Sequence, residues 1–473
     1  MEGNSALLTG RQLAETALAA LPFNPLEGQV LAIYKMAEYV TAGMWRDVFV
    51  LNGYAGTGKT SVIAALIQAL SHFRIKSAVL APTGRAAKVA GGMSQKPAST
   101  IHRRIYHVET ANGAMNVRLS ANRDQNTIFI VDEASLITDG NRGSLLRDLI
   151  RYVYSGQGCK MILVGDTAQL PPVGQSDSPA MNLDRLKQLG LAPFHHTLDV
   201  PVRQAAESGI LYNATIVRQI LERLQNGEPS GIAEGTLPLK LDGFPDIKAV
   251  SSMDLADELS SSWNTVGAEE TLIVTRSNGR ANRFNQAIRN MVMYAEEPLQ
   301  QGDRLVIAKN DYYWGRQNKM KTFLANGETV IVRWVGRPEK QYGRWFVDTE
   351  LELADGQTMS SKVMLRSLMA EGPAIPRVEM EQFFQHVIND EEGGGPTEKI
   401  MAAMENPYYN ALQAKYAYCV TCHKAQGGQW RHVYIDMGGI PAEAMGTDFY
   451  RWLYTALTRA TEKVFLLGVR ENS

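Results

Sequence analysis

One eight-residue segment constrains this chain more than any other stretch. It reads Gly53-Tyr54-Ala55-Gly56-Thr57-Gly58-Lys59-Thr60 and fills every fixed position of the pattern G-x-x-x-x-G-K-[ST]. The apolar run 48–51 precedes it and the helix-like run 61–70 follows it. Glycines let backbone N–H groups close around phosphate oxygens, and the positive end of the helix dipole adds to the attraction. We therefore expect the segment to bind the phosphates of a nucleoside triphosphate.

The residues of this phosphate-binding loop have separable roles. Lys59 is expected to reach the β and γ phosphates, and Thr60 to offer its hydroxyl to Mg²⁺. The remaining loop positions form the cradle: Gly53, Ala55, Gly56, Thr57 and Gly58. A glycine-rich turn matched by chance is the alternative, and the order strand, loop and helix argues against it.

Four short apolar runs alternate with helical stretches in the first 200 residues. They are Val48–Leu51, Ala78–Ala81, Thr127–Val131 and Lys160–Val164. This alternation predicts an α/β fold with a parallel sheet covered by helices on both faces. Each run ends in a polar loop, and ligands of such sheets bind at the carboxyl ends of the strands. We therefore expect the four loops to form one composite site.

Two of these loops carry candidate catalytic groups. Asp132 and Glu133 directly follow the third run; Asp132 is expected to hold Mg²⁺ and Glu133 to polarise the attacking water. Gln169 lies in the loop after the fourth run, where a neutral amide is able both to donate to the γ-phosphate and to accept from that water. An ordinary strand end or turn is the alternative for each.

Two arginines suit stabilisation of the charge that develops during phosphoryl transfer. They are Arg203, in Val202-Arg203-Gln204, and Arg459, in the segment Tyr454–Arg459. A guanidinium offers a two-pronged donor to the γ-phosphoryl oxygens. On spacing alone, a solvated surface arginine is the alternative. If both lie beyond the first α/β unit, the nucleotide is held between two domains.

The rest of the chain continues the α/β pattern with one interruption. A strand is expected at Thr271–Thr275 and a helix at 278–290, and the pattern returns at 416–434 and 449–468. Residues 299–367 are rich in Thr, Val, Tyr and Trp with turn signals, which predicts a small inserted β domain. The expected divisions are 1–200 for the first unit, with a hairpin insert at about 94–123, then 201–298 together with 405–473 for the second unit, and 299–404 for its insert.

Composition excludes several classes of protein. The net charge of −1 and pI near 6.7 argue against a purely electrostatic binder of nucleic acid. No apolar run approaches the ~20 residues that span a bilayer, and the N-terminus has no secretory pattern. Three cysteines fit a reducing compartment. Cys419 and Cys422 lie in the strand-like run 416–421, where residues three apart point to opposite faces, so a zinc site is not expected.

Taken in order, eight segments resemble the motif series of the superfamily 1 helicases, above all the 5′→3′ branch typified by RecD and the short phage helicase Dda. They are 53–60, Ala81–Ala87, Ser99–Arg103, Asp132–Ser135, Gly165–Val173, Val202–Gln204, Thr421–Gly427 and Tyr454–Arg459. The resemblance runs from about Leu26 to Val464. It implies two RecA-like P-loop NTPase domains with an SH3-like insert in the second, ATP and Mg²⁺ as cofactors, γ-phosphate contacts for both arginines, and an adenine contact for Gln29.

The same resemblance implies a DNA-binding groove. Five residues fall where family members touch a single strand: Thr83, Arg85, His102, Thr421 and His423. Hydroxyl and imidazole groups suit phosphate contacts that carry no sequence information. Taken alone, either histidine reads more simply as a core or surface residue. The implied partners are single-stranded and forked duplex DNA, with replication or recombination proteins as further classes, and the chain is expected to act as a monomer in the cytoplasm of a bacterial or phage-infected cell.

Two further segments resemble accessory parts of this branch. Residues 105–119 read as a hairpin around Ala111-Asn112-Gly113, similar to the pin that splits a duplex, although its tip has no aromatic residue. The insert presents Tyr312, Tyr313 and Trp314 together with Lys309, Arg316, Lys319 and Lys321, which suits stacking and phosphate binding. A plain β core with a solvated basic face is an equal alternative.

The sequence therefore predicts a motor in which ATP hydrolysis moves two domains along single-stranded DNA. An ATP-gated nucleic-acid clamp that remodels without processive unwinding is the second hypothesis, because it needs the same motifs. A small-molecule kinase leaves the strand-contact segments unexplained. Direction of movement and the choice of DNA over RNA rest on the resemblance alone.

Overall fold

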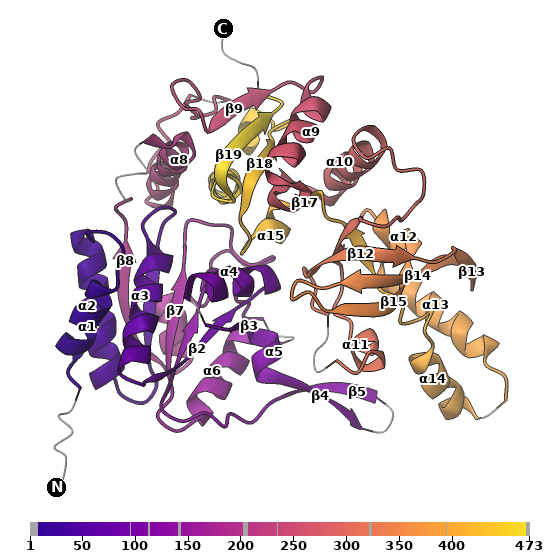
Figure 1. Cartoon of the computed structure of the whole chain (residues 1–473), viewed down its shortest axis with the longest axis horizontal. Coiled ribbons are helices and arrows are strands. Elements are labelled where there is room, and N and C mark those ends of the chain that lie inside the picture. Colours follow the sequence, from indigo (N-terminus) through magenta and orange to yellow (C-terminus); the bar gives the residue numbers. More distant parts are fainter. Residues whose placement is uncertain are drawn as a thin grey trace.

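A computed structural model of the chain describes residues 8–469, apart from 95, 112–113, 141–142, 202–206, 234, 321–323 and 394. The described residues form two parallel sheets, one antiparallel sheet and a two-stranded hairpin. Figure 1 shows the first sheet and its helices below, the second above them, and the antiparallel sheet to one side.

The first sheet has the strand order β3-β2-β6-β7-β1-β8, and its pairings are parallel. Its strands are β1 (Asp47–Gly53), β2 (Lys76–Ala81), β3 (Ala98–Thr100), β6 (Thr127–Val131), β7 (Lys160–Gly165) and β8 (Ala192–Leu198). Its helices are α1 (Gly10–Ala19), α2 (Glu27–Ala42), α3 (Lys59–His72), α4 (Gly84–Ser94), α5 (Ile101–Ile105), α6 (Leu145–Ser155) and α7 (Leu183–Gln188). The four predicted strands are confirmed as β1, β2, β6 and β7.

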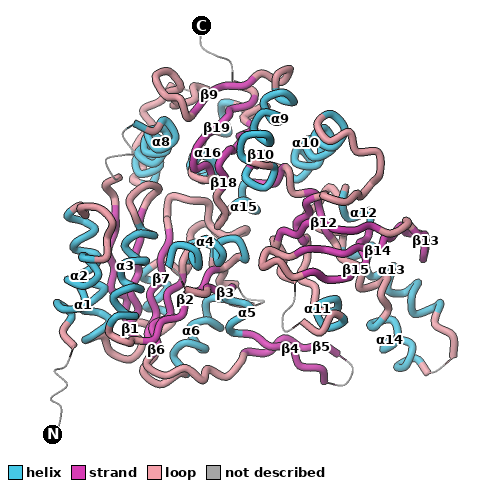
Figure 2. Tube along the Cα trace, in the orientation of Figure 1, coloured by secondary structure: helices cyan, strands magenta, loops and turns pink. Residues whose placement is uncertain are grey.

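The second sheet has the order β17-β10-β18-β19-β9 and is also parallel. Its strands are β9 (Ile247–Val250), β10 (Thr271–Thr275), β17 (Cys419–Thr421), β18 (Trp430–Asp436) and β19 (Ala460–Leu467). Its helices are α8 (Gly209–Gln225), α9 (Leu255–Val266), α10 (Asn278–Met291), α15 (Cys422–Ala425) and α16 (Thr447–Leu457). Two parallel sheets flanked by helices confirm the predicted fold class of two RecA-like units (Figure 2).

The single strand expected over 416–421 is wrong. The chain leaves the antiparallel sheet at β16 (Ala414–Tyr416) and enters the second parallel sheet at β17. Between them, the amide of Ala417 donates to Arg304 of the antiparallel sheet, and the carbonyl of Tyr418 accepts from Ile273 of the parallel sheet. The backbone therefore pairs first with one sheet and then with the other. The hydrophobic periodicity of six residues does not reveal this change. Cys419 lies on β17 and Cys422 opens α15, both as buried free thiols.

The antiparallel sheet confirms a small β insert within the second unit. Its order is β13-β14-β12-β11-β16, and β15 pairs with β14. The bounds are β11 (Arg304–Ile307), β12 (Thr329–Val335), β13 (Glu339–Gln341), β14 (Arg344–Glu352) and β15 (Thr358–Met364), with helices α11 (Tyr313–Gln317), α12 (Leu365–Leu368), α13 (Arg377–Asp390) and α14 (Pro396–Glu405). β16 comes from beyond residue 404, so this sheet takes its last strand from outside the predicted insert, and the helices α13 and α14 were not anticipated.

A hairpin of β4 (Tyr106–Ala111) and β5 (Ala114–Leu119) leaves the first unit after α5. Its strands confirm the hairpin predicted over 105–119, while residues 112 and 113 at its tip lie outside the described residues. In Figure 1 the hairpin extends toward the side of the molecule that carries the insert. The short 3₁₀ helices span Ala134–Leu136, Ala268–Glu270 and Ala442–Ala444.

The two parallel units pack directly on each other. Ala168 and Leu170, in the loop after β7, are buried in the hydrophobic core of the second unit. Tyr54 and Ala55 of the phosphate-binding loop pack against the same core. The carboxyl ends of the first sheet therefore face the second unit, so any ligand of the phosphate-binding loop lies at the junction of both.

Candidate nucleotide site and strand groove

The phosphate-binding loop has the backbone that its glycines predict. Gly56 and Gly58 adopt φ values of 73° and 82°, in the left-handed region that glycine reaches without strain. Helix α3 begins immediately afterwards at Lys59, with Thr60 half-buried in its first turn. A Cβ atom at Gly53 would lie 2.7 Å from Cγ of Lys59, so glycine is needed there for the lysine to fold back over the loop. The segment is a cradle that fits a phosphate chain.

The ammonium of Lys59 lies inside this cradle. It donates to the carbonyl of Gly53 and, at 3.0 Å, to that of Tyr54. It is 4.0 Å from the carboxylate of Asp166 at the end of β7. The lysine is therefore positioned by loop carbonyls and by one acid at the carboxyl edge of the sheet.

Asp132 and Glu133 meet Lys59 at the same edge. Burial, followed by the charge of Glu133, raises the pKa of Asp132 to about 6, against the lowering effects of the hydrogen bond from the Glu133 amide and of the charge of Lys59. Glu133 has a φ of 51°, an uncommon conformation for a residue with a side chain, and such strain concentrates at functional sites. A hydroxyl from Thr60 and a carboxylate from Asp132 are the hard oxygen ligands that Mg²⁺ prefers, so the donor set fits that ion.

Gln29 and Gln169 occupy different surroundings. Gln29 is 1% exposed; its amide donates to Thr57 at 2.9 Å, and its oxygen accepts from the amide of Leu26 at 2.9 Å. Both ends of Gln29 thus hold the start of α2 to the phosphate-binding loop, and its contact with adenine stays a prediction. Gln169 is 5% exposed, and its Oε1 has no hydrogen-bond partner among the described residues.

Of the two predicted arginines, the structure describes one. Arg203 lies outside the described residues. Arg459 is buried in the second unit, where its guanidinium donates to Thr455 and Gly428 at 3.0 Å and to Thr458 at 3.2 Å. Its contact with a γ-phosphate requires the side chain to leave these partners, and both arginine roles stay predictions.

The second unit reaches the phosphate-binding loop through residues that the sequence analysis did not select. The guanidinium of Arg218, on α8, lies 4.3 Å from the ring centre of Tyr54. The hydroxyl of Tyr454, on α16, accepts from the amide of Ala55 at 2.8 Å. Tyr454 begins the segment that carries Arg459, so its position was available in the sequence, but nothing in the pattern distinguished it from a core tyrosine.

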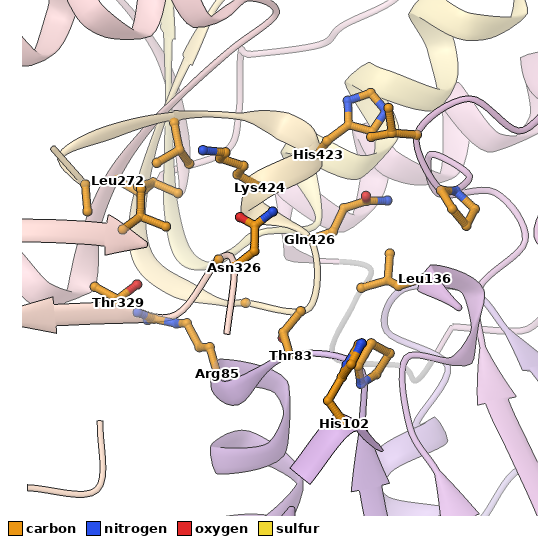
Figure 3. A pocket seen from close by; sticks show the side chains of 18 of the residues that line it. Thr83, Arg85, His102, Leu136, Leu272, Asn326, Thr329, His423, Lys424 and Gln426 are labelled. Carbon is orange, nitrogen blue, oxygen red and sulfur yellow. The ribbon is translucent and has the colours of Figure 1, made fainter. Parts of the chain in front are cut away.

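A cavity of about 370 Å³ lies where the first unit, the second unit and the insert meet. Four of the five predicted strand contacts line it, namely Thr83, Arg85, His102 and His423. Thr83 directly precedes α4, and the other three lie on α4, α5 and α15. Figure 3 shows these side chains around the cavity together with Asn326 and Thr329 of the insert. The fifth residue, Thr421, immediately precedes α15, the helix that carries His423. We refer to this cavity as the strand groove.

Some charged groups of the strand groove already have partners within the protein. Arg85 stacks 4.0 Å from the ring centre of Trp430, donates to the carbonyl of Gln429 at 2.5 Å and lies 3.6 Å from Glu270. Burial lowers its pKa to about 10, so it remains a cation at neutral pH. Partial desolvation lowers the pKa of both His102 and His423, which favours neutral imidazoles there.

Lys424 is a groove residue that the sequence analysis quoted but did not select. Its Nζ is buried and has no hydrogen-bond partner among the described residues, and burial lowers its pKa. It lines the groove beside His423 (Figure 3). A desolvated ammonium without a partner is suited to a phosphate, because it has no internal contact to give up.

The aromatic and basic set of the insert favours the plain β-core alternative. The hydroxyl of Tyr313 donates to the carbonyl of Glu405 at 3.1 Å, and the indole of Trp314 donates to that of Asn410 at 2.8 Å. Arg316 pairs with the carboxylate of Glu405. These side chains fasten α11 to the end of α14 and to the segment that follows it, rather than offering stacking faces. Lys321 lies outside the described residues.

Comparison with known proteins agrees with this geometry. The model of an AAA domain matches residues 35–231, and that of a UvrD-like helicase C-terminal domain matches residues 416–467; together these segments cover more than half of the chain. These two matches, taken with the helicase relatives described below, support a superfamily 1B helicase of the RecD/Pif1-like branch. This confirms the resemblance drawn from the eight motifs.

Among relatives in this branch, the ATP-dependent RecD2 DNA helicase of Deinococcus radiodurans is 27% identical over 89% of this chain and 46% of that protein. The ATP-dependent DNA helicase PIF7 of Trypanosoma brucei brucei is 23% identical over 96% of this chain and 47% of that protein. The chain thus spans about half the length of these two relatives. A crystal structure of Pif1 helicase from Bacteroides with ADP-AlF3 and single-stranded DNA aligns over 94% of both chains, with 15% identity and a TM-score of 0.44. In the described part of this superfamily 1B chain, no helix is long and apolar enough to cross a membrane.

Proposed function

We propose that the chain is an ATP-dependent DNA helicase that moves 5′→3′ on single-stranded DNA and unwinds the duplex ahead of it. The observation that carries this proposal is the strand groove, because four of the five predicted strand contacts line it from both parallel units and it lies at their junction, as the phosphate-binding loop does. The names of the two curated relatives support the same activity.

In this proposal the nucleotide site is assembled from both units. Lys59 neutralises charge on the β and γ phosphates, and Glu133 orients the attacking water. Thr60 and Asp132 would hold Mg²⁺, which when bound neutralises developing charge on the phosphates. Gln169 senses the terminal phosphate from its buried position, and Gln29 contacts the adenine. Arg203 and Arg459 supply positive charge from the second unit.

Movement follows from the position of the groove. Residues 1–200 form one motor domain, residues 201–298 with 405–473 the other, and residues 299–404 its insert, whose sheet also takes β16 from the second domain. Strand contacts come from both domains, so a change in their separation on hydrolysis displaces one set of contacts relative to the other. Single-stranded DNA and forked duplexes are the proposed partners, acted on by a monomer in the cytoplasm of a bacterial or phage-infected cell.

The decisive test measures ATP hydrolysis with and without single-stranded DNA, then unwinding of duplexes with a 5′ or a 3′ tail. We expect hydrolysis to rise with the single strand and the 5′-tailed duplex to be unwound. No stimulation by the strand would refute the motor. Stimulated hydrolysis without unwinding of either duplex would favour the ATP-gated clamp, and preference for the 3′ tail would refute the direction. A Glu133→Gln variant, which retains the site but lacks the carboxylate, controls for contaminating ATPase.

A further inference from the structure

The hydroxyl of Tyr454 joins the second unit to the phosphate-binding loop and to the end of β7. It accepts from the backbone amide of Ala55 at 2.8 Å and donates to Oδ2 of Asp166 at 2.7 Å. The tyrosine is 1% exposed. Burial, followed by the charge of Asp166, raises its pKa well above its ordinary value, so the hydroxyl keeps the proton that it donates.

Asp166 is a buried carboxylate with two candidate partners for the same oxygen. It is 1% exposed, and its Oδ1 accepts from the amide of Ala168 at 3.0 Å. Its Oδ2 accepts from Tyr454 and lies 4.0 Å from Nζ of Lys59. A buried carboxylate is costly unless it is hydrogen-bonded or paired, so removing the tyrosine leaves Lys59 as the cation best placed to compensate it.

The position of Tyr454 is fixed by its neighbours on the same unit. Thr455 accepts from the amide of Leu170 at 2.8 Å, and Gln426 donates to the carbonyl of Leu170 at 2.6 Å. One turn earlier on α16, Arg451 donates to the carbonyl of Ser176 at 2.7 Å. The hydroxyl therefore reaches Asp166 only while α16 is docked on the loop after β7.

We propose that Tyr454 is a positioning residue for Lys59 that acts through Asp166 and makes nucleotide affinity depend on docking of the second unit. While the units are docked, the hydroxyl satisfies Asp166, so the ammonium of Lys59 stays over the loop carbonyls of Gly53 and Tyr54, where the phosphates bind, and is not drawn to the carboxylate. When they separate, Asp166 draws Lys59 away and nucleotide is released more readily. This regulation rests on the proposed function, because it gives domain movement a direct effect on nucleotide binding.

The test is equilibrium binding of a fluorescent ATP analogue with Mg²⁺ and without DNA, to the whole chain. Tyr454→Phe keeps the ring and removes the hydroxyl; we expect its affinity to fall about tenfold, the factor expected for one hydrogen bond to a charged group. Tyr450→Phe is the matched control, since Tyr450 is buried on the same helix and packs on Phe449. Its affinity should equal that of the unmodified chain.

A double-mutant cycle tests the route through Asp166. Asp166→Asn removes the charge that attracts Lys59, so Tyr454→Phe should have no further effect on affinity in that background. An unchanged affinity of Tyr454→Phe, with or without a lower melting temperature, overturns the proposal. A tenfold loss that persists undiminished beside Asp166→Asn also overturns it. Failure of the unmodified chain to bind the analogue refutes the proposed function instead, so the two failures are distinguishable.

Discussion

Replacement of Lys424 by methionine tests whether the strand groove binds DNA, because it should raise the free energy of unfolding and lower the affinity for DNA. The Nζ of Lys424 is buried without a hydrogen-bond partner among the described residues, and its charge also lowers the pKa of Lys415 nearby. Methionine is similar in length and needs no such partner. Removing an unpaired buried ammonium should stabilise the free protein by about 1 kcal/mol, near the lower end of the cost of an unsatisfied polar group.

The effect on the strand should have the opposite sign. If the ammonium meets a phosphate, its loss removes a hydrogen bond between charged groups and should weaken binding by roughly tenfold or more. The logarithmic salt slope should also become shallower by about 0.7, the value for one phosphate contact on a single strand. Both quantities come from anisotropy titrations of a labelled oligonucleotide at several salt concentrations, and stability from urea denaturation.

The matched control is Lys463→Met, which removes an exposed lysine from β19 of the same unit. It should change neither the salt slope nor the affinity. An unchanged salt slope for Lys424→Met would refute the phosphate contact. A loss of stability in that variant would show that the ammonium has a stabilising partner in the folded protein, contrary to its environment here.

Three further predictions use the nucleotide site and the insert. Lys59→Ala should abolish ATP hydrolysis while leaving strand binding in the absence of nucleotide within about twofold, since the P-loop and groove contacts are separate; loss of strand binding in anisotropy would contradict this. Arg459→Ala should still bind a fluorescent ATP analogue, but its rate of ATP hydrolysis should fall by about 10³-fold. Because the substitution removes three internal hydrogen bonds, the melting temperature should fall as well. A normal rate of hydrolysis would show that Arg459 is not part of the site. Burial, then the charge of Lys424, lowers the pKa of Lys415 from 10.5 to about 8, so the unfolded chain binds more protons between these values and stability from this group rises with pH there. Between pH 8 and 10 the free energy of unfolding, measured by urea denaturation, should therefore rise less for Lys415→Met than for the unmodified chain. An equal rise would show that Lys415 does not cause this pH dependence.

The local structure around the predicted nucleotide site could be predicted because its signals are local. Strand, loop and helix around Lys59 are encoded within about twenty consecutive residues, and the acids at Asp132 and Glu133 follow a strand whose burial is visible in its composition. The parallel order of the strands then brings these loops to one edge without further information.

Contacts across units were harder to predict because they depend on docking rather than on local pattern. Tyr454 and Arg218 lie far from the phosphate-binding loop in sequence, and each resembles an ordinary core or surface residue until α16 and α8 are placed against it. The insert shows the converse error. Tyr313 and Trp314 had the composition of a stacking platform. Their polar atoms instead bond to the backbone at the end of α14 and just after it, and the β-rich pattern did not predict that helix.

Helix α16 docks the second unit on the loops at the carboxyl edge of the first sheet. Arg451, Tyr454 and Thr455 lie within little more than one turn of that helix, and each contacts a loop at the carboxyl edge of the first sheet. A rigid rotation of the second unit cannot change one of these contacts without changing the others. Gln426, which follows the helix of His423, bonds to the same Leu170 as Thr455, so displacement of the groove side of the second unit acts on the loop that carries Gln169. Packed polar contacts thus join Gln426, which lines the strand groove, to the loop that carries Gln169, so the proposed coupling of strand position to nucleotide state needs no long relay.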